Sequence, residues 1–111
     1  MKSLQKQADK VLFKWVAGKY LGMDNLDMRC PGDYKEPVED AQVELCHKLS
    51  KRWSKQDRLI AKKRWGEDES KRSVASIALR YGLGRTKVDN RIEWMRDCVI
   101  ESCVKVTTIY R

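Results

Sequence analysis

Residues 77–92, IALRYGLGRTKVDNRI, carry side chains whose types and spacing suit contact with a polyanion more than catalysis. Two helices that cross steeply through a short turn need a small residue where their backbones meet, and Ala78 is suitably placed. The turn itself needs a residue that tolerates positive φ, which Gly82 supplies. Leu83 can fill the gap beneath the turn, and Val88 falls on the core side of the next helix. An ordinary helical hairpin with a glycine stop has the same spacing, so the residues after the turn decide between the two.

The helix that follows the turn exposes polar and basic side chains in its first two turns. In a major groove, Arg or Lys can donate to guanine and Asn can pair with adenine. The free N–H groups and partial positive charge of a helix N-terminus also attract phosphates. The expected base contacts come from Arg85, Lys87, Asn90 and Arg91. Thr86 is as suited to a phosphate as to a base. Asp89 can accept from cytosine or complement the helix N-terminus, and the sequence leaves both open.

Further cations flank this segment and can anchor phosphates without reading the base sequence. They are Lys62, Lys63, Arg64, Lys71, Arg72 and Arg80. Any one of them alone is typical of a solvated surface. As a group beside two crossed helices they favour nucleic acid.

The distribution of charge along the chain supports the same interpretation. The 111 residues carry 24 Lys and Arg against 16 Asp and Glu, a net charge of +8. Residues 46–91 hold 14 basic and 5 acidic side chains, whereas residues 22–45 hold 2 basic and 7 acidic ones. Because the positive charge is concentrated around the predicted helix pair, an acidic partner is more plausible than a general effect on solubility.

Helical periodicity accounts for the elements that must position these residues. Apolar residues at intervals of three and four predict an amphipathic helix within residues 1–22 and further helices across residues 38–103. Residues 22–37, with both prolines, predict a loop. We expect one all-α domain over residues 1–111, made of about five helices, with residues 38–103 as the DNA-binding region and a helix-turn-helix at 73–103.

Several boundaries within this scheme rest on local signals. The helix that starts at Val38 runs through Ala41, Leu45 and Leu49 and can reach Trp53. Ser54 with Asp57 three residues later predicts a capping box at the start of the next helix. The β-branched run at residues 104–109 fits an extension of the last helix, a frayed end or a short strand.

The sequence contains no pattern typical of a catalytic site or a metal site. No nucleophile and base are suitably paired, and no glycine loop suits a phosphate. The cysteines Cys30, Cys46, Cys98 and Cys103 show no CxxC pair, and Cys98 and Cys103, five apart, should diverge on a helix. We therefore expect structural, reduced thiols, no metal, no cofactor and no enzyme activity. No apolar run approaches the roughly 20 residues that span a bilayer, so we expect no membrane partner and a cytoplasmic location.

The same residues also resemble a known family. IALRYGLGRTKVDNRI is similar to the DNA-binding unit of sigma-factor-type helix-turn-helix domains. VLFKWVAGKY (11–20), VEDAQVELCHKLSKRW (38–53) and RIEWMRDCVIESC (91–103) resemble helices of the short bacteriophage late-gene antitermination proteins called Q. Gly84 stands where related units often place Ser, so a side-chain cap is missing there.

This resemblance implies a protein of the bacterial cytoplasm that binds double-stranded DNA near a phage late promoter. It would then load onto a paused bacterial RNA polymerase carrying a sigma factor and permit readthrough of terminators. Arg85, Thr86, Lys87, Asn90 and Arg91 would occupy the DNA-contacting positions. The first helix or the acidic segment from Asp24 to Glu44 would be candidates for polymerase contact. Another phage DNA-binding regulator, a terminase small subunit and a protein-interaction module remain alternatives.

Overall fold

The chain folds into an all-α structure with five α-helices in the computed structural model, which describes residues 2–20, 40–66 and 71–105. The helices are α1 (Lys2–Tyr20), α2 (Asp40–Ser50), α3 (Lys55–Gly66), α4 (Val74–Tyr81) and α5 (Arg85–Val99). A short π-helical segment, η3 (Ile100–Val104), continues the axis of α5. This confirms the predicted fold class.

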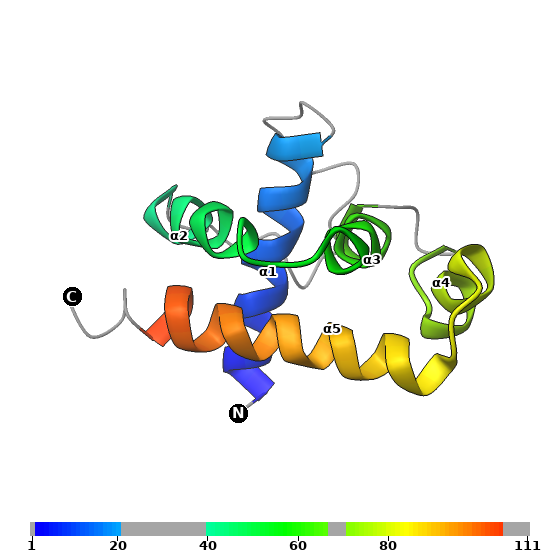
Figure 1. Cartoon of the computed structure of the whole chain (residues 1–111). Helices are drawn as coiled ribbons and strands as arrows, with labels where there is room; N and C mark the ends of the chain where they lie inside the picture. The colour runs from blue at the N-terminus through cyan, green and yellow to red at the C-terminus, as the bar shows by residue number, and fades with distance from the viewer. Residues whose placement is uncertain (1, 21–39, 67–70, 106–111) are drawn as a thin grey trace.

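Helix α1 lies at the centre of the arrangement and crosses α5 steeply, while α2 and α3 lie over α5 on either side of it (Figure 1). It contacts α2, α3, α5 and η3, so the other elements assemble around it. Helix α4 packs against α3 and the first part of α5, at one end of the 42 Å long axis. The predicted helix pair therefore projects from one end of a body that α1 holds together.

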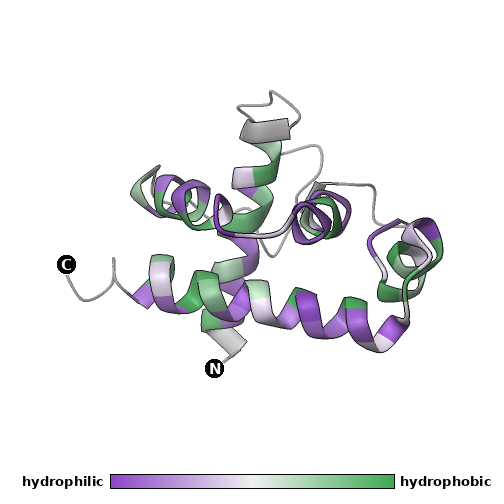
Figure 2. Cartoon of the chain, in the orientation of Figure 1, coloured by the Kyte–Doolittle hydropathy of each residue, from purple (hydrophilic) through white to green (hydrophobic). Residues whose placement is uncertain are grey.

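The core is built from the apolar faces of α1, α3 and α5. Its largest members are Trp15 and Trp65, each 2% exposed, and around them pack Leu12, Ile60 and Met95 at 0%. Burying an apolar side chain such as Leu, Ile or Met stabilises the fold by about 1.5–3 kcal/mol relative to leaving it exposed. Figure 2 shows hydrophobic residues along much of α1 and in η3, and mostly hydrophilic residues along the first turns of α5.

A buried carboxylate joins three helices at the centre of the fold. Asp9 of α1 is 8% exposed and accepts from the indole N–H of Trp65 at 3.0 Å. It also accepts from Nε of Arg96 in α5 at 3.0 Å. A buried charge is stable only when it is paired and hydrogen-bonded, and both partners are present here. Asp9 thus fixes the positions of α3 and α5 relative to α1.

The end of α2 and the burial of single residues in α1 and α2 differ from the expectations. Helix α2 ends at Ser50, and Trp53 lies in the following turn, 3% exposed, with its ring edge-on to Trp15 at 5.7 Å. Ala41 is exposed instead of lining the apolar face of α2, and Lys10 of α1 is buried, at 3% exposure, although the helical period of residues 1–22 places most of the lysines there away from the apolar side. The predicted loop at residues 22–37, together with positions 38–39 at the expected start of α2, lies outside the described residues.

The π-helical segment η3 brings Cys103 next to Cys46 of α2. In η3 the backbone N–H of Lys105 bonds to the carbonyl of Ile100, five residues back, which is the π-helical pattern. Cys103 is fully buried there and its thiol is hydrogen-bonded to that of Cys46 in α2. That bond and burial raise the pKa of Cys46, while accepting the bond lowers the pKa of Cys103. Helical structure therefore continues through Lys105, which agrees with an extension of the last helix at the start of the β-branched run. The rest of that run, residues 106–109, lies outside the described part of the chain.

Candidate nucleic-acid interface

Helices α4 and α5 meet through the predicted tight turn. Ser73 caps α4, accepting from the backbone N–H of Ser76 at 3.0 Å. Gly82 adopts the left-handed conformation, with φ 64° and ψ 36°, and Leu83 then donates its N–H to the carbonyl of Ala78 at 2.9 Å. Only glycine enters this region of φ without a steric cost. The turn therefore follows directly from the local sequence.

The contact between the two helices uses the expected apolar side chains. Ile77 and Ala78 of α4 are 1% and 5% exposed, and Val88 and Ile92 of α5 are 0% and 2% exposed. Ala78 leaves room for the close approach, and Val88 fixes which side of α5 faces inward. As a result the opposite side of the first two turns of α5 faces solvent.

Four of the predicted contact residues lie on that solvent side. Arg85, Thr86, Lys87 and Asn90 are all exposed. Gly84 caps α5 in an extended conformation and makes no side-chain hydrogen bond to the first turn. The start of α5 therefore presents two cations, an amide, a hydroxyl and a helix N-terminus to one region of solvent, a combination suited to phosphates and base edges.

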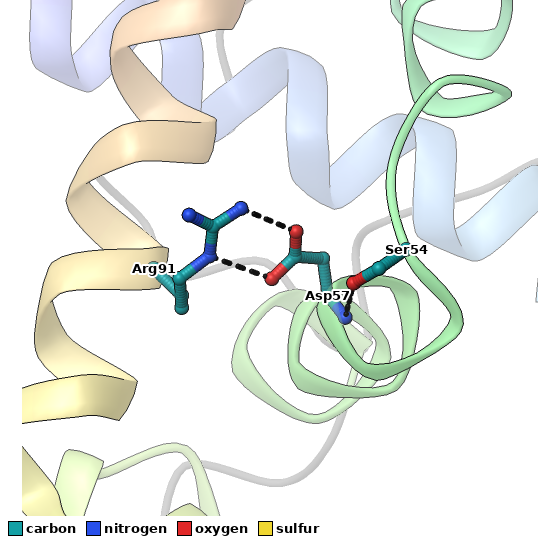
Figure 3. Close-up of polar contacts among 3 residues, drawn as sticks. All are labelled: Ser54, Asp57 and Arg91. Atoms are coloured by element: carbon teal, nitrogen blue, oxygen red, sulfur yellow. Dashed lines mark hydrogen bonds and ion pairs between the residues drawn. The ribbon is translucent and has the colours of Figure 1, made fainter.

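The guanidinium of Arg91, another predicted base contact, is engaged within the protein (Figure 3). Its Nε donates to Oδ1 of Asp57 at 2.8 Å and its Nη2 to Oδ2 at 2.5 Å, a bidentate pair between α5 and α3. The Asp57 side chain is 5% exposed and that of Arg91 is 35% exposed. Arg91 also lies 4.3 Å over the ring of Trp94, and hydrogen bonding to Asp57 raises its pKa. Because two of its N–H groups are bonded to Asp57, Arg91 helps to position α5 and is less available to a base than Arg85 is.

Asp57 shows why the capping-box prediction is only half right. Its backbone N–H donates to the Oγ of Ser54 at 3.1 Å, as a capping box requires (Figure 3). The second half of the motif would send the Asp57 carboxylate back toward Ser54. In this fold the carboxylate binds Arg91 instead. The three-residue spacing contained no signal for this partner, which is 34 positions away.

The predicted phosphate anchors divide into two groups. Lys71 and Arg80 are exposed beside α4. Lys62, Lys63, Arg64 and Arg72 are half-buried. Arg64 donates from Nη1 to the carbonyl of Arg72 at 2.9 Å, and the Arg72 guanidinium lies 4.9 Å over the ring of Phe13. These two arginines tie the end of α3 to α1, so Lys71 and Arg80 are the better-placed anchors.

A row of carboxylates limits how far a polyanion can lie along α5. Asp89, Glu93, Asp97 and Glu101 are all exposed and repeat every four residues through α5 into η3, so each lies close to the next while the row winds by about 40° at each step. Glu101 pairs with Lys105 at 2.7 Å. We call these four residues the acidic row. Since it begins in the second turn, only the N-terminal end of α5 combines exposure with positive charge.

The described residues were also compared with what a metal site or a membrane-spanning helix requires. Within residues 2–20, 40–66 and 71–105, no cluster of three or more His, Cys, Asp and Glu side chains is placed to hold a metal ion. Trp94 is the one tryptophan of the four in the chain that is substantially exposed, at 41%, and it packs 6.4 Å from Trp53. None of the described helices has the length and apolar character needed to cross a membrane.

Comparison with known proteins adds no relative. No protein family, curated protein or solved structure matches this chain.

Proposed function

We propose that this protein binds duplex DNA by inserting the N-terminal end of α5 into the major groove. The observation that carries the proposal is the exposure of Arg85, Thr86, Lys87 and Asn90 at the start of a helix whose opposite side is anchored by Val88. A helix held in this way by a preceding crossed helix has the dimensions of a major-groove reader.

The chemistry of each side chain assigns its role in this proposal. Arg85 and Lys87 donate to guanine O6 and N7, and Asn90 pairs with adenine. Thr86 lies in the first turn, where a hydroxyl and the free backbone N–H groups reach a phosphate. Lys71 and Arg80 contact the backbone on the α4 side, which sets the orientation of the protein without selecting a sequence.

Enrichment from a pool of random-sequence duplexes tests this proposal. We expect the protein to select a convergent sequence, and the affinity for it to fall by about 10³ or more between 50 and 200 mM salt if six or more phosphates are contacted. Arg85→Ala and Lys87→Ala should lose the selected preference while Lys71→Ala should weaken all duplexes equally. Failure to bind any duplex at 50 mM salt would refute the proposal.

A more specific role, transcription antitermination, is supported by the resemblance of residues 11–20, 38–53 and 77–103 to the phage Q proteins. We propose that DNA binding serves to load the protein onto a paused bacterial RNA polymerase. In a transcription assay with a promoter-proximal pause and a downstream terminator, the protein should increase full-length RNA only on templates that carry its selected site. Binding without increased readthrough would favour a phage regulator or a terminase small subunit.

A further inference from the structure

Helix α4 presents a large apolar side chain to solvent that the fold does not use. Leu79 is 86% exposed, whereas its neighbours Ile77 and Ala78 are 1% and 5% exposed and pack toward α5. Among the described residues, the other exposed large hydrophobic side chains are Leu59 at 38% and Trp94 at 41%. A leucine this exposed on a short, well-capped helix stabilises nothing within the chain.

Two hollows lie on either side of Leu79. One, of about 480 Å³, is lined by Lys63, Lys71, Ser76, Ile77, Leu79 and Arg80. The other, of about 610 Å³, is lined by Ala75, Ser76, Ala78, Leu79, Gly82, Leu83 and Arg85. Leu79 and Ser76 line both hollows, so the two adjoin on the surface of α4. We call this surface, Leu79 with the two hollows, the Leu79 face.

The charge around the Leu79 face restricts what can cover it. All the charged residues that line it within the described part of the chain are basic, namely Lys63, Lys71, Arg80 and Arg85. A second copy that used the same face would bring like charges together, which opposes a symmetric dimer. The partner must therefore be acidic.

The apolar part of the Leu79 face separates two kinds of acidic partner. A phosphate backbone satisfies the cations but offers no apolar group to cover Leu79 and the floor formed by Ala75, Ala78 and Leu83. An amphipathic helix offers carboxylates and bulky apolar side chains at intervals of three and four residues, which can enter two adjoining hollows. Both properties of the face are satisfied only by a protein segment.

We propose that the Leu79 face binds an acidic amphipathic helix of another protein, whose apolar side chains occupy the two hollows while its carboxylates pair with Lys71, Arg80 and Arg85. This interaction goes beyond DNA binding and does not require it. Lys71, Arg80 and Arg85 belong both to this face and to the proposed DNA contacts. Because the two surfaces overlap at these three cations, the partner helix and DNA should compete for the α4 side of the protein.

The test uses a fluorescent synthetic peptide that places Leu and Phe at i, i+3 and i+7 and Asp or Glu elsewhere. A scrambled peptide of the same composition and a peptide with the same apolar pattern but Lys in place of the acids serve as controls. Fluorescence anisotropy should show saturable binding of the acidic amphipathic peptide only. Leu79→Lys should weaken that binding by about tenfold or more.

Matched variants distinguish this proposal from its competitors. Leu59→Lys changes an exposed leucine that lines neither hollow, and it should leave peptide binding unchanged. Leu79→Lys should retain or increase affinity for random duplex DNA, because it adds a cation beside the DNA-contacting end. The proposal would be overturned by absence of binding, by equal binding of the scrambled peptide, or by loss of duplex affinity in Leu79→Lys. Self-association of the wild type that Leu79→Lys abolishes would overturn it in favour of a dimer.

Discussion

Arg85 and Arg91 are less than two turns apart on α5, yet their guanidinium groups meet different surroundings. Arg85 is exposed at the N-terminal end, while Arg91 forms a bidentate pair with a carboxylate of α3 that is only 5% exposed. An exposed arginine that has no structural task can be removed at little cost to stability. Removal of Arg91 would leave Asp57 charged, largely buried and without its partner. The two residues thus form a matched pair for separating folding from binding.

Arg91→Ala is expected to lower the free energy of unfolding by about 1.5–3 kcal/mol, the usual cost of losing a hydrogen-bonded charged partner. Arg85→Ala should change it by no more than about 0.5 kcal/mol. Urea denaturation followed by tryptophan fluorescence measures both. Arg91→Lys is the control, since it keeps the charge but not the bidentate geometry and should recover only part of the loss. Equal stability of the two alanine variants would contradict the structural role of Arg91.

Arg85→Ala is expected to weaken binding to the selected duplex by about 1–3 kcal/mol and to relax the base preference at one position. At a temperature where Arg91→Ala is still folded, that variant should bind the same duplex with a smaller loss. Titration of each variant with selected and unrelated duplexes provides the comparison. If Arg91→Ala loses the selected preference as fully as Arg85→Ala, then Arg91 leaves Asp57 on binding and contacts a base after all.

The reactivity of the Cys98 thiol reports how far this part of α5 is buried. Burial and, to a lesser extent, the charge of Asp97 raise the pKa of its thiol. Because the thiolate is the reactive form, alkylation of Cys98 should become fast only at a pH above that for a free cysteine, about 8.5. Mass spectrometry of the Cys98 peptide after timed iodoacetamide treatment gives the pH profile. Cys46 and Cys103, both fully buried, should react only on unfolding, and a Cys98 profile like that of a model peptide would refute the expectation.

At the scale of elements, the two glycines of the turn have different tasks. Gly82 has φ 64°, whereas Gly84 has φ −72°, which any residue can adopt. No atom lies within 4 Å of a Cβ built on either glycine, so a side chain would meet no clash in either case. Their substitution therefore tests backbone conformation alone.

Gly82→Ser is expected to destabilise the protein by about 1–2 kcal/mol, because an L-residue in the left-handed region bears that cost. Gly84→Ser should be neutral or stabilise by a few tenths of a kcal/mol, since serine can accept from the first turn of α5 as an N-cap. Thermal unfolding of the two variants measures the difference. A loss of stability in Gly84→Ser as large as that in Gly82→Ser would show that the cap of α5 is not as described.

The elements could be predicted from the sequence to the extent that local rules determine them. The turn between α4 and α5 depends on residues within ten positions of one another, and its glycine, its alanine and its core valine are placed as predicted. The partner of Asp57 and the buried position of Lys10 depend on how distant helices pack, and no local pattern contains that information.

At the scale of the whole molecule, α1 is as important to the proposed interface as the helices that form it. It contacts α3 and α5, and its Asp9 bonds to Trp65 and Arg96. These contacts set the angle at which α5 leaves the body, while Arg91 and Asp57 set its rotation toward α3. The N-terminal end of α5, the proposed site of DNA contact, therefore projects from a base that these contacts hold together.

The acidic row then determines the direction from which DNA can approach. Asp89 and Asp97 are eight residues apart, about 12 Å along a helix. The Debye length at 0.1 M salt is about 10 Å, so a carboxylate one such distance from a phosphate contributes little repulsion. If DNA meets only the N-terminal end of α5, Asp89 should oppose binding much more than Asp97 does.

Asp89→Asn is therefore expected to raise affinity for a non-selected duplex severalfold, Glu93→Gln by less, and Asp97→Asn hardly at all. A non-selected duplex is used so that no base contact of Asp89 enters the comparison. Fluorescence anisotropy at two salt concentrations measures the three variants, and the differences should shrink at the higher concentration. Equal gains from all three substitutions would mean that DNA lies along the whole length of α5, and the end-on orientation would be wrong even though the protein binds DNA.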